Sequence, residues 1–179
     1  MVSKLDGINQ SSMKNPILDE IDGLVKMTSG KQQDYFLQMQ KDAKPIKIFS
    51  VTEIFSEKEI DYILAEIAPR KRECYRNASL LAKSFLGIGN GIEYVEGKVT
   101  VYGGISLDHA FNKVGDKYFD ITLELALCKP FSAIESEYYV SLLECGVQEL
   151  IEVENRTGVY GNIYAERYIE NNVRRQANK

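Results

Sequence analysis

A chain of 179 residues is long enough to bury one domain's core, with room for an additional arm. Its composition, 44% hydrophobic and 27% charged, is ordinary for a globular protein, and no run of about 18 apolar residues predicts a membrane span. The net charge of −4 argues against general nucleic-acid binding but leaves room for a local basic patch.

The compartment is inferred from the cysteines and the N-terminus. The three cysteines form no Cys-x-x-Cys pair, which argues against a disulfide framework or a structural zinc site. The first residues lack the apolar core of a signal peptide, so we expect a cytoplasmic protein. Export without a cleaved signal stays open, as does the oligomeric state.

Residues 1–45 are expected to form a helical arm or subdomain in front of a main domain that spans 46–179. Apolar side chains recur at helical spacing over 17–25 and again over 31–41, which predicts two short amphipathic helices. This arm packs on the main domain or stays mobile; the pattern does not distinguish the two.

The main domain is expected to begin with an extended segment over 45–51. Ser56 and Glu59 then have the spacing of a capping box, and Pro69 ends the helix that follows. The apolar face of that helix is expected to contain Ile60, Ile63, Leu64 and Ile67.

A second helix of this domain is predicted from Cys74 to about Phe85, with Cys74 in register with its apolar stripe. The alternate glycines of 87–91 are expected to close this helix and open a turn. This glycine run is not a phosphate loop, because it follows a helix and precedes a strand.

Three strands are predicted after the glycines. The first covers 92–96, and Gly97-Lys98 is interpreted as a turn. The next begins at Val99 or, beyond the Gly103-Gly104 break, nearer Ile105. The segments 109–114 and 117–122 are expected to pair through a tight turn at Gly115-Asp116.

That hairpin has a geometric consequence for the single histidine of the chain. If Gly115 and Asp116 form the turn, Phe111 pairs with Asp120, and His109 lies diagonally across from Asp120. Because side chains alternate between faces, His109 and Asp120 share one side of the sheet within reach of each other.

The last third of the chain carries fewer signals. A helix is predicted over 136–153, followed by a break near Gly158 and an aromatic-rich segment with a final helix. Residues 171–179 are polar and are expected to form a frayed tail.

Cys74, His109 and Asp120 have the residue types and order of an activated thiol nucleophile with its base and orienting carboxylate. A helix N-terminus favours a thiolate, and Arg72 and Arg76 would add to that effect. Backbone N–H groups at this helix start are the natural donors to an oxyanion.

Each member of this set also has a simpler explanation: a core cysteine, a satisfied strand histidine and a surface aspartate. A metal site from Cys74, His109 and Asp120 is possible in residue type, but the spacing matches no zinc pattern. Cys128 and Cys145 are interpreted as packing residues. No cofactor or metal is expected.

The Cys74 helix start, His109-Ala110-Phe111 and the strand around Asp120-Ile121-Thr122 resemble the transglutaminase-like branch of the papain-like cysteine enzymes. The resemblance covers about 50 residues. It implies an α+β fold with a papain/transglutaminase-like core, in which the nucleophile helix packs on an antiparallel sheet. It also implies a catalytic triad of Cys74, His109 and Asp120.

The departures from that family point away from protein crosslinking. Phe111 stands where members usually have tryptophan, Ile121 often replaces a proline, and the approach to Cys74 lacks glycines. Many members of this branch are proteases, amidases or deamidases. The small size of the chain is similar to that of stand-alone bacterial or phage proteins.

We therefore expect a thiol-dependent amide hydrolase or acyltransferase that acts through a thioester on a peptide, protein or small amide substrate. Two alternatives stay open: a non-catalytic binding or inhibitor protein on the same fold, and a binding module for anions or nucleic acid that uses residues 70–76. The candidate substrate or oxyanion contacts are Tyr75, Arg72, Asn77 and Phe111.

Overall fold

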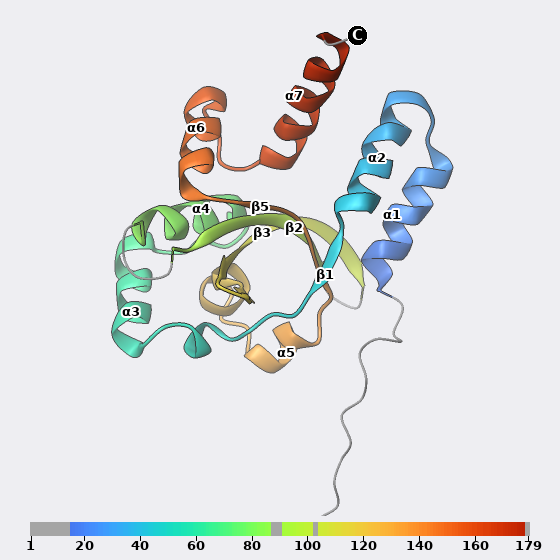
Figure 1. Cartoon of the computed structure of the whole chain (residues 1–179). Helices are drawn as coiled ribbons and strands as arrows, with labels where there is room; N and C mark the ends of the chain where they lie inside the picture. Colours follow the sequence, from blue (N-terminus) through green and yellow to red (C-terminus); the bar gives the residue numbers. More distant parts are fainter. Residues whose placement is uncertain (1–14, 87–90, 102–103, 178–179) are drawn as a thin grey trace, which may run out of the picture.

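The computed structural model describes residues 15–86, 91–101 and 104–177, which fold as a mixed α+β protein (Figure 1). The strands are β1 (Lys44–Ile46), β2 (Glu93–Val101), β3 (Ile105–Val114), β4 (Lys117–Phe119) and β5 (Tyr139–Cys145). The helices are α1 (Pro16–Met27), α2 (Gly30–Asp42), α3 (Glu57–Tyr62), α4 (Cys74–Ser84), α5 (Phe131–Glu135), α6 (Val147–Thr157) and α7 (Ile163–Ala177). Shorter turns are η2 (Val51–Glu53), η3 (Ile63–Ile67) and η4 (Thr122–Ala126).

The strands form one antiparallel sheet in the order β1-β5-β2-β3-β4. Figure 1 shows this sheet curling around the segment that follows β4, with α4 and α6 on its outer side. The predicted α+β class, with a helix that begins at Cys74 and packs on an antiparallel sheet, is confirmed.

The sheet is buried on both faces. The outer-face core joins β2 and β3 to α1, α4 and α6, and the inner-face core lies within the curl. The outer-face core includes Ile17, Ile21, Leu81, Tyr94, Ala110 and Leu150. The inner-face core includes Val95, Val99, Phe111, Ile134 and Tyr139.

The predicted turn and pairing of β3 with β4 are confirmed, with Val114 opposite Lys117 and Asn112 opposite Phe119. The second strand was predicted to reach 122 but ends at Phe119, because the chain turns into η4 at Thr122, so the expected pair of Phe111 with Asp120 does not form. Gly115 has a φ of 59°, a left-handed conformation that glycine adopts without a steric penalty. The residues that flank a two-residue turn exchange both backbone hydrogen bonds, so every second residue of β3 directs its N–H toward β4. Since β4 ends at Phe119, the edge of β3 continues past it at Ala110.

The turn predicted at Gly97-Lys98 is wrong, because β2 runs through both residues. The pairing of β2 with β5 shifts by one residue between Glu96 and Gly97. A Cβ atom added at Gly97 would lie 2.0 Å from the Val140 carbonyl oxygen. Glycine is therefore required here by the close approach of two strands, and not by a reversal of the chain.

The two helices predicted in the arm are confirmed as α1 and α2. The Asn15 side chain accepts a hydrogen bond from the Ile17 N–H at 3.0 Å and so caps α1. Ile17 and Ile21 are completely buried, and α1 and α2 contact β2 and β5. The described part of the arm is therefore packed on the sheet.

The segment before the Cys74 helix contains the predicted capping box, in which the Ser56 N–H donates to the Glu59 carboxylate at 2.8 Å. The helix continues as η3, a π-helical turn, and ends at Ala68 in a left-handed conformation. The wider turn rotates the apolar face, so Ile63 and Ile67 are buried but Leu64 is exposed, against the prediction.

The helix predicted over 136–153 is wrong in its first half, which forms β5 between β1 and β2, and correct in its second half, which begins α6. The final helix is present as α7. It continues to Ala177, so residues 171–177 are helical where a frayed tail was expected.

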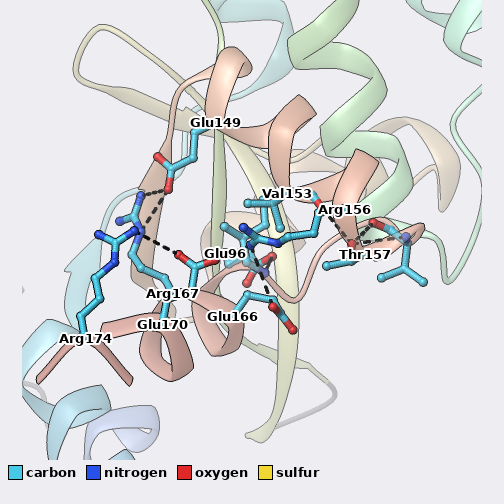
Figure 2. A network of polar contacts seen from close by, with 11 residues as sticks. Glu96, Glu149, Val153, Arg156, Thr157, Glu166, Arg167, Glu170 and Arg174 are labelled. Atoms are coloured by element: carbon cyan, nitrogen blue, oxygen red, sulfur yellow. Dashed lines mark hydrogen bonds and ion pairs between the residues drawn. The ribbon is translucent and has the colours of Figure 1, made fainter. Parts of the chain in front are cut away.

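Ion pairs connect the last two helices, as Figure 2 shows. Arg167 of α7 donates from Nε to Glu149 of α6 at 3.1 Å, and Arg156 of α6 lies 2.6 Å from Glu170 of α7. The Glu96 side chain of β2 accepts hydrogen bonds from the backbone N–H groups of Ile163 and Tyr164, each at 2.9 Å. A sheet carboxylate thus caps the N-terminus of α7.

Some predictions lie outside the described residues: most of the glycine turn over 87–91, the break at Gly103, and the last two residues of the tail. None of the helices that the structure describes is both long and apolar enough to cross a membrane.

Candidate active site

Cys74 is the first residue of α4, as predicted, and its thiol is partly buried. The N–H groups of the first helical turn have no acceptor within the helix and carry its positive dipole end. The Asn77 side chain holds the loop before this turn, because its Oδ1 accepts from the Arg70 N–H at 3.0 Å and its Nδ2 donates to the Arg70 carbonyl at 2.7 Å. The same Nδ2 donates to the Thr122 hydroxyl at 3.1 Å, which links α4 to η4.

His109 lies on β3, is buried, and places its Nε2 2.7 Å from Oδ2 of Asp120. The predicted contact of His109 with Asp120 is therefore confirmed, although Asp120 lies beyond the last strand pair of the hairpin. The imidazole also interacts with the Cys74 side chain, and the two groups shift each other's pKa. Since Nε2 is engaged by Asp120, Nδ1 is the ring nitrogen available to the thiol.

Asp120 is almost completely buried just beyond the end of β4. Its Oδ1 accepts from the backbone N–H groups of Thr122 at 2.9 Å and Leu123 at 3.0 Å. Its Oδ2 accepts from the Tyr139 hydroxyl at 3.0 Å as well as facing His109. The carboxylate is thus held by four groups, and its orientation fixes that of the imidazole.

The three groups shift one another's pKa values. Burial alone would raise the pKa of the Cys74 thiol, but the hydrogen bond and positive charge of His109 lower it below its ordinary value. Burial alone would lower the pKa of His109, but Asp120 and Cys74 raise it. Burial opposes the charge on Asp120, yet His109 and the donors around it lower its pKa. These directions favour thiolate, imidazolium and carboxylate together.

The backbone of β3 also contributes to the site. A backbone hydrogen bond from Ala110 to the Cys74 side chain lowers the pKa of the thiol, after burial and His109. Ala110 is one of the β3 residues whose N–H points toward the side of β4, beyond the last pair of the hairpin. Because β4 ends at Phe119, the Ala110 N–H is directed toward the Cys74 sulfur and not toward a paired strand.

The four candidate contact residues lie in different environments. Tyr75 is half-buried beside Cys74, and Arg72 is exposed with a left-handed φ of 64°. Asn77 is completely buried, a position suited to holding the loop. Phe111 is buried behind His109, with ring centroids 6.4 Å apart and planes at 25°.

The basic residues around the start of α4 are partly neutralised by an acidic neighbour. Glu73 lies 3.8 Å from Arg70 and 3.6 Å from the Nε of Arg76. This pairing reduces the positive charge that the segment would offer to an anion.

The other two cysteines do not join the site. Cys145 is buried in the outer-face core, as predicted, and burial raises its pKa to about 12. Cys128 is exposed, so its interpretation as a packing residue is wrong. Among the residues described, no cluster of three or more histidine, cysteine, aspartate or glutamate side chains could hold a metal ion.

Two parts of the site were not foreseen from the sequence. Asp120 accepts from the N–H groups two and three residues ahead, a capping pattern that the spacing of Asp120 and Thr122 could have indicated. Tyr139 reaches Asp120 from β5, and no local signal points to this contact because its segment was interpreted as a helix.

Comparisons of the chain with protein-family models, with curated proteins and with solved structures find no match.

Proposed function

We propose that this protein is a cysteine-dependent hydrolase or acyltransferase that acts on an amide bond, with the papain/transglutaminase-like arrangement of its nucleophile helix and sheet. The observation that carries the proposal is the position of His109, which hydrogen-bonds Asp120 at 2.7 Å and interacts with the Cys74 side chain so that the pKa of the thiol is lowered. A base held between a helix-start thiol and a buried carboxylate is the geometry that nucleophilic catalysis needs.

In the proposed reaction, the Cys74 thiolate attacks the carbonyl carbon of the amide, and the carbonyl oxygen becomes an oxyanion. N–H groups of the first turn of α4 are the candidate donors to that oxyanion. The imidazolium of His109 gives its proton to the leaving amine, and a thioester remains on Cys74. His109 then removes a proton from water or from a second amine, which attacks the thioester and releases Cys74.

The test is the pH dependence of iodoacetamide alkylation, followed at each cysteine by mass spectrometry. In the wild type, Cys74 should react with an apparent pKa well below the ordinary value of about 8.5. In His109→Ala the apparent pKa should rise, because burial then acts on the thiol without the opposing imidazolium.

Cys128 and Cys145 are internal references in the same experiment, one exposed and one buried. A Cys74 that reacts no faster than Cys128 at neutral pH, or whose profile ignores the loss of His109, would contradict the proposal. That result would favour a binding protein without chemistry.

A further inference from the structure

A side pocket of about 180 Å³ lies on the outer face of the sheet and is lined on α4 by Tyr75, the residue after Cys74. Its walls come from α2, α4 and the start of α7, and its floor from β2 and β3. The residues used below are Tyr35, Tyr75, Glu96, Lys98, Asp108 and Tyr164. The pocket therefore combines the arm and the last third of the chain, two regions that the proposed triad does not use.

The pocket is connected to the proposed nucleophile through Tyr75, which follows Cys74 on α4. Asp108 precedes His109 on β3, and strand alternation directs its side chain to the face opposite the His109 imidazole. Burial, then the charges of Glu96, Cys74 and Asp108, raise the pKa of Tyr75. A substrate side chain near the reacting carbonyl would lie beside this space.

The ionisable groups that line the pocket include the carboxyl groups of Glu96 and Asp108 and the ammonium group of Lys98. Lys98 lies 2.9 Å from Asp108 and 3.7 Å from Glu20, so two carboxylates share one ammonium. Glu96 adds a third carboxylate, which is fixed by the N-terminus of α7 and by the Tyr94 hydroxyl at 2.9 Å. Asp108 keeps 69% of its side chain exposed and remains accessible to a further cation.

Aromatic rings complete the walls. Tyr35 of α2 and Tyr164 of α7 meet edge to face with centroids 5.9 Å apart, and Tyr75 lines the pocket from α4. Aromatic faces together with carboxylates attract ammonium and guanidinium groups more than neutral ones. The volume is several times that of a water molecule and leaves room for a long side chain.

We propose that the side pocket selects amide substrates that carry a lysine or arginine side chain next to the reacting carbonyl. This inference rests on the proposed function, since the pocket acts only through a reactive Cys74. It assigns specificity to α2 and β3, with Tyr35 and Asp108 as the residues that recognise the cation.

The experiment uses acetyl-dipeptide chloromethyl ketones with arginine or its neutral isostere citrulline at the first or the second position from the ketone. The Cys74 thiolate displaces chloride and forms a thioether, and intact-protein mass spectrometry gives the rate constant. With the wild-type chain, the arginine probe should react about tenfold faster than the citrulline probe in at least one position.

The ratio of the two rates is an internal measure, because a change in thiol reactivity cancels from it. Asp108→Asn and Tyr35→Leu, on different elements, should each reduce the ratio to about threefold or less. Asp116→Asn, which changes an exposed carboxylate in the hairpin turn, should leave the ratio unchanged.

A ratio near one at both positions, with Cys74 still reactive toward iodoacetamide, would overturn the pocket assignment alone. A ratio that stays high in both Asp108→Asn and Tyr35→Leu would overturn the assigned recognition residues. A Cys74 inert to iodoacetamide would instead overturn the proposed function, and the pocket proposal with it.

Discussion

The buried carboxylate of Asp120 is surrounded by donors, and this explains how a charge is tolerated in the protein interior. The carboxylate accepts hydrogen bonds from two backbone N–H groups and from the Tyr139 hydroxyl, and it pairs with the His109 ring. A buried charge with all its hydrogen bonds made is stable, whereas one that loses a charged partner is costly. Asp120 and His109 should therefore behave as a unit.

Asp120→Asn should lower the free energy of unfolding by about 2–3 kcal/mol, since it removes the charge that His109 faces and leaves donors without ideal acceptors. It should also raise the apparent pKa of Cys74, because a less stable imidazolium stabilises the thiolate less. Urea unfolding and iodoacetamide alkylation measure the two effects. Asp116→Asn, an exposed carboxylate four residues earlier, is the matched control and should change neither.

The pH dependence of the stability lost in Asp120→Asn follows from the direction in which the pKa values of Asp120 and His109 are shifted. The lowered pKa of Asp120 contributes stability above its ordinary value of 3.8, and this is lost as the pH falls through the lowered pKa. The raised pKa of His109 contributes stability below its ordinary value of 6.5, and this is lost as the pH rises through the raised pKa. Both contributions are present near pH 5–6, so equal stabilities of wild type and Asp120→Asn there would contradict the pairing.

At the scale of the elements, the hairpin of β3 and β4 was predictable because the residues that determine it are close together in the sequence. Gly115-Asp116 fixes the turn and the register, which bring Asp120, just beyond the end of β4, to His109 of β3. The start of α4 was predictable for the same reason, from the apolar stripe in register with Cys74.

β5 was not predictable in this way. Its strand lies inside a sheet with a hydrophobic core on each face, so its residues show no alternation of apolar and polar side chains. Tyr139, Leu142 and Leu143 then fit a helical spacing equally well. The contact of Tyr139 with Asp120 was missed together with the strand that carries it.

Gly97 was misinterpreted because a glycine between two β-like runs commonly marks a turn, whereas here it permits close contact with β5. Gly97→Ala should lower the free energy of unfolding by about 2–3 kcal/mol, since its Cβ would clash with the Val140 carbonyl unless β2 and β5 move apart. Urea unfolding is the measurement.

Gly23→Ala is the matched control for this substitution. Gly23 lies within α1 and has open space where a Cβ would be added. Alanine there should raise the stability by about 0.5–1 kcal/mol, because glycine is the poorer helix former. Similar effects at the two positions would show that the approach of β2 to β5 is looser than the structure has it.

At the scale of the whole molecule, α1 and α2 share the core of the sheet. Ile17, Ile21 and Met39 belong to the outer-face core together with residues of α4 and β2. We therefore expect the arm and the rest of the chain to unfold as one cooperative unit.

Ile21→Ala should lower the free energy of unfolding by about 3 kcal/mol, through lost apolar burial and the cavity that remains. The alkylation of Cys74 under urea and the far-UV circular dichroism should report the same lowered midpoint. Met27→Ala, at an exposed position of α1, should stay within about 0.5 kcal/mol of the wild type. If the Cys74 signal kept its midpoint in Ile21→Ala, the arm would be an independent subdomain.

The chain order of the site has a consequence for protein synthesis. Cys74 leaves the ribosome before His109, Asp120 and Tyr139, and these arrive on β3, after β4 and on β5 in turn. A nascent chain that has not yet exposed the hairpin has no base for its thiol, whose acidity is then that of an ordinary cysteine. The lowered pKa of the Cys74 thiol is thus acquired only after β3 and the segment that carries Asp120 have been made.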